Sequence, residues 1–174
     1  MKLIGIERII QMFKIYCDGS CKGNGKENAV GAFAYVVLNE KDEELFHFMT
    51  AVPKTTNNQM EMMALIDAIE SLKQYCKENT KEFEVEVYTD SAYIHNCMAQ
   101  KWYKNWIKNG WINSKKEPVK NKKLWESIIP YFEDSRIKIF KVKGHSKDEN
   151  EHEKWNNVVD KMAREAANNL SKKS

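Results

Sequence analysis

The sequence predicts an α/β fold in which a five-stranded mixed sheet is flanked by helices. Three segments with strand patterns come first, at Phe13–Cys17, Val30–Leu38 and Leu45–Met49. Two further strand patterns then alternate with helical patterns, and this order is typical of a mixed sheet with helices packed on it. The chain has 174 residues, of which 42% are hydrophobic, so it is long enough for one domain with a sizeable core.

The first three strands are predicted from alternation and from turn residues. Every second side chain is apolar over 13–17, and we expect this strand to end at Asp18-Gly19-Ser20. Gly23-Asn24-Gly25 predicts a turn between the first two strands, which are therefore expected to pair antiparallel.

The later elements are predicted mainly from apolar spacing. Apolar residues recur at steps of three and four in Asn58–Tyr75, which indicates a long helix. A fourth strand, Phe83–Tyr88, precedes a helix beginning at Asp90-Ser91. The remaining elements are a helix and a loop within Lys101–Lys123, a helix at Leu124–Phe132, a fifth strand at Arg136–Val142 and a last helix at Asn156–Leu170. We therefore divide the chain into an N-terminal extension (1–12), one domain (13–170) and a basic tail (171–174) that is expected to fray.

Composition excludes several classes of protein. The four cysteines form no CxxC pair and no zinc-type spacing, so reduced thiols are expected. Glu7 and Arg8 interrupt the amphipathic residues 1–12, which argues against a signal peptide or a membrane span there. No other segment is long and apolar enough to cross a bilayer. We expect a soluble, cytoplasmic and monomeric protein that does not contact membranes.

Four acidic residues fall where the predicted elements can bring them together. Asp18 closes the first strand and Asp90 closes the fourth, so parallel pairing of these strands would place both at one edge of the sheet. Glu61 lies in the first turn of the long helix, and Asp160 lies within the last helix. Clustered carboxylates repel each other unless cations lie between them, and hard oxygen ligands suit Mg²⁺ or Mn²⁺. Two such ions about 4 Å apart can activate a water molecule and stabilise the leaving oxygen of a phosphodiester.

Each acid also has a purely structural alternative. Asp18 could form a turn, and Asp90 could cap the helix that Ser91 begins. Glu61 fits a capping box that starts at Asn58. Asp160 could pair with Arg164, four residues further along the helix.

Five short motifs favour a functional role for these acids over the structural alternatives, because the motifs occur in the order of one known family. They are Tyr16-Cys-Asp-Gly-Ser-Cys21, Thr55-Thr-Asn-Asn-Gln-Met-Glu61, Tyr88-Thr-Asp-Ser91, Val142-Lys-Gly-His-Ser146 and Val159-Asp-Lys-Met-Ala163. From about Phe13 to about Ala167, the chain resembles a bacterial-like type 1 ribonuclease H.

The resemblance implies a ribonuclease H-like fold and an endonuclease that cuts the RNA strand of RNA–DNA hybrids. By resemblance, two Mg²⁺ ions, or Mn²⁺, support hydrolysis that leaves 5′-phosphate and 3′-hydroxyl ends. The family's four metal-binding acids fall on Asp18, Glu61, Asp90 and Asp160.

A histidine follows the predicted fifth strand, where the family keeps a mobile catalytic histidine. By resemblance, His145 orients the attacking water or helps the product and metal leave. The segment between His145 and Asp160 is longer than is usual in the family. His152 is therefore a rival for the same role.

Positive charge is concentrated in Lys101–Lys123, which has eight lysines and one glutamate, while the rest of the chain is net −4. Lysines in this arrangement neutralise phosphates without sequence choice. The segment resembles the family's basic protrusion, which grips the DNA strand. We expect its tryptophans to pack within the protrusion and also allow them to line the DNA-side groove. The predicted contacts here are Trp102, Lys104, Trp106, Lys115 and Lys116.

Discrimination of RNA from DNA requires groups that sense the 2′-hydroxyl. By resemblance, Cys21, Asn24, Asn57 and Asn58 lie along the minor-groove contacts of the hybrid, and Thr56 with Asn121 resembles a DNA phosphate pocket. The alternative is that the asparagines serve only as turn and cap residues. No aromatic, basic module precedes Phe13, so a stand-alone enzyme without a separate hybrid-binding domain is expected. The competing functions are a DNA nuclease or resolvase on the same architecture, a non-catalytic hybrid-binding module, and the corresponding domain of a reverse transcriptase.

Overall fold

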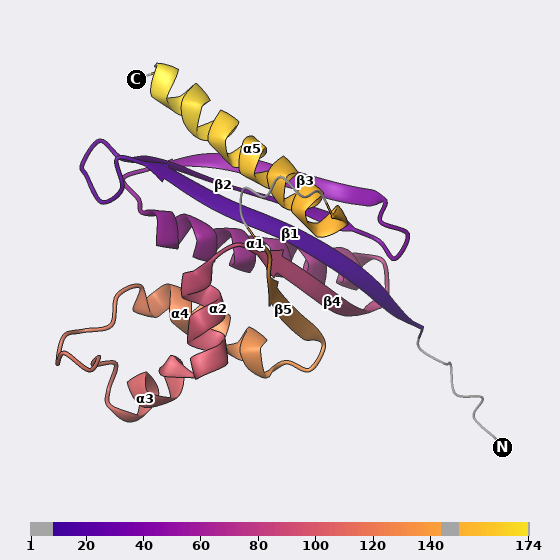
Figure 1. Ribbon diagram of the computed structural model, residues 1–174. Coiled ribbons are helices and arrows are strands. Elements are labelled where there is room, and N and C mark those ends of the chain that lie inside the picture. Colours follow the sequence, from indigo (N-terminus) through magenta and orange to yellow (C-terminus); the bar gives the residue numbers. More distant parts are fainter. Residues whose placement is uncertain (1–8, 144–149, 174) are drawn as a thin grey trace.

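A five-stranded mixed sheet forms the centre of the structure, a computed structural model that describes residues 9–143 and 150–173 (Figure 1). The strand order is β3-β2-β1-β4-β5. Neighbouring strands β1, β2 and β3 pair antiparallel, whereas β4 and β5 run parallel to β1. The bounds are β1 Ile10–Lys22, β2 Val30–Leu38, β3 Glu44–Pro53, β4 Glu82–Thr89 and β5 Ile137–Lys141. The predicted fold class is confirmed.

Helices cover both faces of this sheet. Four of them pack on one face, where the larger core lies, and the fifth crosses the opposite face (Figure 1). The first face carries α1 Asn57–Glu78, α2 Ala92–Gln100, α3 Trp102–Lys108 and α4 Lys122–Glu133, and the second carries α5 Glu151–Lys173. Within residues 9–143 and 150–173, none of the helices combines the length and the apolar character that a membrane span requires.

Several ends differ from the sequence prediction. β1 begins at Ile10, so residues 10–12 of the predicted N-terminal extension belong to the sheet. The strand also continues past Asp18 to Lys22, because it pairs with β2 along this whole stretch, ending with Lys22 opposite Val30. The turn role for Asp18 is therefore wrong. α5 extends past the predicted end to Lys173, so the predicted tail continues the helix for three residues.

Candidate active site

The register between β1 and β4 places two acids side by side. Tyr16 pairs with Tyr88 in this parallel ladder, and Asp18 and Asp90 each follow two residues later. Side chains two residues apart point to the same face of a strand. Asp18 is only 2% exposed. Ser91, not Asp90, caps α2 by accepting a hydrogen bond from the backbone N–H of Ile94 at 3.2 Å. The alternative of a capping role for Asp90 is therefore wrong.

A close approach of α1 to β1 brings Glu61 to the same place. A Cβ on Gly19 would lie 2.4 Å from the backbone nitrogen of Glu61, so only glycine permits this contact. Thr56 caps α1, accepting from the Gln59 backbone N–H at 3.2 Å. Because the helix begins at Asn57, Glu61 lies beyond the first turn. The predicted capping box at Asn58 is therefore wrong, and Glu61 is left available to the acids on the sheet.

Asp18, Glu61 and Asp90 form one tight group of carboxylates. One oxygen from each lies within 4.8 Å of the others. Burial raises the pKa of Asp18 well above its usual value, and the charges of Glu61 and Asp90 raise it further. Burial also raises the pKa of Glu61, again with a contribution from the charge of Asp90. The raised pKa values mean that Asp18 and Glu61 favour their protonated forms unless a cation offsets the negative charge of the group.

One oxygen atom of this group fits the role of a cation ligand. In the part of the chain that the structure describes, Oε2 of Glu61 is buried and has no hydrogen-bond partner. A buried polar oxygen without a partner is costly and needs an explanation. Carboxylate oxygens are the ligands that Mg²⁺ and Mn²⁺ prefer. The donor set thus fits a hard divalent cation.

Asp160, the fourth predicted acid, is not a member of this group of three. It lies on α5, is 8% exposed, and forms a hydrogen bond with Asp18 that helps to raise the pKa of Asp18. Its Oδ2 also lies 3.1 Å from Nη2 of Arg164. The predicted pairing with Arg164 is confirmed, and the contact with Asp18 places Asp160 next to the group as well.

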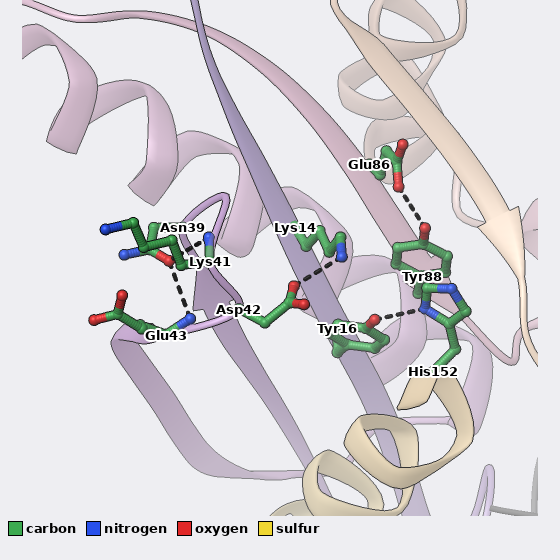
Figure 2. A network of polar contacts seen from close by, with 9 residues as sticks. All are labelled: Lys14, Tyr16, Asn39, Lys41, Asp42, Glu43, Glu86, Tyr88 and His152. Atoms are coloured by element: carbon green, nitrogen blue, oxygen red, sulfur yellow. Dashed lines mark hydrogen bonds and ion pairs between the residues drawn. The ribbon is translucent and has the colours of Figure 1, made fainter. Parts of the chain in front are cut away.

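Of the two candidate histidines, His152 lies within the described residues and His145 lies outside them. His152, in the first turn of α5, has its Nδ1 2.6 Å from the hydroxyl of Tyr16, and its ring stacks on Tyr88 with centroids 4.3 Å apart (Figure 2). These contacts attach the start of α5 to β1 and β4, which is a structural role for His152.

The predicted hybrid contacts near α1 lie together. A cavity of about 560 Å³ is lined by Asn24, Thr56, Asn57, Asn58, Gln59, Lys120 and Asn121. Asn24 Oδ1 accepts from the Asn57 backbone N–H at 2.7 Å, which ties the β1–β2 turn to the start of α1. Cys21 lies close by, with its thiol donating to the Thr55 carbonyl at 3.3 Å. Sequence reasoning missed Gln59 and Lys120, although both lie in stretches that it had singled out.

The basic segment divides into packed tryptophans and exposed lysines. Trp102 and Trp106 pack against the core, and Trp106 lies between Trp111 and Trp125 with ring centroids 6.2 and 5.6 Å away. The expected packing of these tryptophans is confirmed. The three lysines predicted to contact nucleic acid are all exposed, Lys104 on α3 and Lys115 and Lys116 on the turn that follows it. Asn113 Oδ1 holds that turn by accepting from two backbone N–H groups.

Comparisons with known proteins identify the family of this chain. The RNase H family model matches residues 11–168. Ribonuclease H from Clostridium botulinum is 43% identical over 153 residues, which cover 87% of this chain and 93% of that protein. Ribonuclease H from Syntrophomonas wolfei is 40% identical over 156 residues, covering 90% and 96%.

Solved structures share the fold at lower identity. The crystal structure of LC9-RNase H1, a type 1 RNase H with the type 2 active-site motif, has a TM-score of 0.72 at 23% identity, covering 92% of this chain and 74% of that one. The solution structure of the PFV RNase H domain has a TM-score of 0.71 at 24% identity, covering 91% and 96%. The family match spans nearly the whole chain, and relatives at 40% identity or more cover most of it, so this protein belongs to the ribonuclease H family of endoribonucleases.

Proposed function

We propose that this chain hydrolyses the RNA strand of RNA–DNA hybrids as an endonuclease, leaving 5′-phosphate and 3′-hydroxyl ends. The observation that carries the proposal is the carboxylate group of the buried Asp18 and the partly buried Glu61 and Asp90, in which one buried oxygen of Glu61 has no hydrogen-bond partner among the described residues. The 43% identity to a protein named Ribonuclease H supports it. So does a TM-score of 0.63 to LC11-RNase H1, whose structure was solved in complex with RNA/DNA hybrid, since the shared fold makes a similar groove feasible.

The acids would hold two Mg²⁺ ions, or Mn²⁺, with Asp18, Glu61, Asp90 and Asp160 as the ligands. Such ions, when bound, lower the pKa of a water molecule and stabilise the leaving oxygen of the phosphodiester. The chain contributes a rigid frame, because the three acids are held by β1, α1 and the end of β4. Arg164 restrains Asp160 from the solvent side. We assign His145 the role of orienting the attacking water or releasing the product.

Substrate binding would use two surfaces on the α1 side of the sheet. The cavity between α1 and α4 offers backbone and amide donors together with Lys120, and these suit phosphate and sugar oxygens. The exposed lysines Lys104, Lys115 and Lys116 would add affinity that does not depend on sequence. Asn57 and Asn58, at the start of α1, are the groups best suited to sense a 2′-hydroxyl.

The test compares matched, end-labelled substrates of one sequence: RNA–DNA hybrid, duplex DNA and duplex RNA. We expect cleavage of the RNA strand of the hybrid alone, only with added Mg²⁺ or Mn²⁺, and none by Asp90→Asn. Glu126→Gln, an exposed carboxylate on α4, is the matched control and should cleave normally. Extension of the upstream product by a polymerase would report the 3′-hydroxyl end, and ligation of the downstream product the 5′-phosphate. Cutting of duplex DNA alone would replace this proposal with a DNA nuclease, and binding without turnover would leave only a hybrid-binding module.

A further inference from the structure

The cavity between α1 and α4 has the chemistry of an oxyanion site. It lies where the first turn of α1 meets the start of α4, and it is lined by four asparagines, Thr56, Gln59 and Lys120. None of the residues that line it is acidic. The N-terminus of a helix as long as α1 also carries partial positive charge. These features together favour a phosphate oxygen over a cation.

Gln59 connects two of the surrounding residues through its side-chain amide. The Thr55 hydroxyl donates to Gln59 Oε1 at 3.0 Å, and Gln59 Nε2 donates to Asn121 Oδ1 at 3.2 Å. Thr55 is only 5% exposed, and within the described residues Gln59 Oε1 is the one acceptor that its hydroxyl meets. A reversed Gln59 amide would leave that buried hydroxyl hydrogen without an acceptor, which is costly. Thr55 therefore fixes the orientation of Gln59.

The orientation of Gln59 in turn fixes that of Asn121. Because Asn121 Oδ1 accepts from Gln59, the free end of the Asn121 amide is its NH₂ group. Its backbone adopts the left-handed conformation, with a φ of 61°, directly before α4. With the opposite orientation, Asn121 would present its oxygen and repel an anion. The Thr55–Gln59–Asn121 chain thus decides whether the cavity offers a donor or an acceptor.

We propose that Gln59 is a positioning residue that holds the Asn121 amide with its NH₂ group available to one backbone phosphate of the bound hybrid. Gln59 does not itself contact the reacting atoms. It acts on the affinity for substrate through Asn121, and the inference rests on the proposed function.

The experiment measures KM and kcat on the hybrid for three variants. Gln59→Met removes the donor to Asn121 Oδ1 without adding charge, Gln59→Glu draws the Asn121 NH₂ group inward, and Asn121→Ala removes the amide. We expect each to raise KM about tenfold, the cost of one hydrogen bond to a charged group, with a much smaller change in kcat. Gln74→Glu, which makes the same substitution near the other end of α1, should keep the wild-type KM.

Two further readouts separate positioning from general damage to the fold. In an Asn121→Ala background, Gln59→Met should add less than about twofold to KM, because the amide that it positions is gone. A scan of single neutral methylphosphonates along the DNA strand should find one position that raises the wild-type KM and has no further effect in Gln59→Met.

A wild-type KM for Gln59→Met in an active enzyme would overturn the inference and leave the proposed function intact. The same conclusion follows if the Gln59→Met and Asn121→Ala effects multiply, or if only Gln59→Glu is impaired, which would indicate simple charge repulsion. If the wild-type protein does not cut the hybrid, the proposed function itself fails.

Discussion

Asp18→Asn is expected to stabilise the metal-free protein while abolishing hybrid cleavage. Asp18 is 2% exposed, and its carboxylate lies within 4.8 Å of those of Glu61 and Asp90. Two unit charges at that separation repel by about 3.5 kcal/mol at an effective dielectric constant of about 20. Proton uptake relieves part of this repulsion, so we expect the free energy of unfolding to rise by about 2 kcal/mol. For a chain of this size that corresponds to a melting temperature higher by about 4–8 °C.

The same substitution should change how stability depends on pH. The usual pKa values of Asp18 and Glu61, 3.8 and 4.5, are both raised in the folded protein. Above those values the unfolded chain has lost protons that the folded protein still binds, so stability falls as pH rises toward the raised pKa values. Asp18→Asn removes one of these protons and lowers the repulsion on Glu61. The slope should therefore become flatter.

Thermal unfolding in a chelator, between about pH 5 and pH 8, measures both effects. Glu126→Gln removes an exposed carboxylate on α4 and should change neither the melting temperature nor the slope by more than a small amount. Added Mg²⁺ should raise the melting temperature of the wild-type protein and have little effect on Asp18→Asn, because ligands stabilise only the state that binds them. An Asp18→Asn variant that melts below the wild-type protein in chelator, with an unchanged pH slope, would refute the argument from clustered charge.

Three further predictions concern the frame and the surfaces around this group. Gly19→Ala should lower the free energy of unfolding by about 3 kcal/mol and weaken Mg²⁺ binding, because its Cβ would lie 2.4 Å from backbone atoms of α1. A denaturant midpoint equal to that of the wild-type protein would contradict the close contact. Replacing Lys104, Lys115 and Lys116 with alanine should lower the slope of log affinity against log salt by about 3, measured by anisotropy with hybrid, and an unchanged slope would remove these lysines from the phosphate surface. His152→Phe keeps a ring on Tyr88 but loses the hydrogen bond with Tyr16, so unfolding should become easier by about 1 kcal/mol with little change in cleavage rate. Loss of cleavage without loss of stability would instead make His152 catalytic.

The sequence was sufficient to predict the sheet and the proximity of Asp18, Glu61 and Asp90, because strand and helix patterns place these residues on adjoining elements. Strand alternation and the parallel crossover determine that Asp18 and Asp90 emerge at neighbouring positions. The prediction was poorer at element ends, where tertiary pairing outweighs local pattern. β1 continues through Asp18-Gly19-Ser20 because β2 offers a complete set of backbone partners there. The turn-forming character of those three residues is overridden.

Side-chain chemistry between distant elements was the least predictable part. Gln59 belongs to the same sequence motif as Glu61, but spacing alone does not predict its hydrogen bonds with Thr55 and Asn121. Asn121 precedes α4, and 62 residues separate it from Gln59. The start of α5 was also misplaced, at Asn156 instead of Glu151, because its first turn is polar. What holds that turn is the contact of His152 with Tyr16 and Tyr88, which come from other elements.

The repulsion among the three carboxylates persists only because the backbone that carries them forms a rigid frame. Mutual repulsion would push Asp18, Glu61 and Asp90 apart if their backbones were free to move. Pairing of β1 with β2 holds Asp18, which lies opposite Ala34, and the same glycine contact that brings α1 close holds Glu61. The frame therefore prevents the repulsion from being relieved by movement, and protons or cations must relieve it instead. In such a site, folding imposes repulsion among the carboxylates, and a cation that binds there relieves it. This relief contributes to the free energy of cation binding. It follows that changes which loosen the frame, such as Gly19→Ala, should weaken metal binding even though they leave every carboxylate in place.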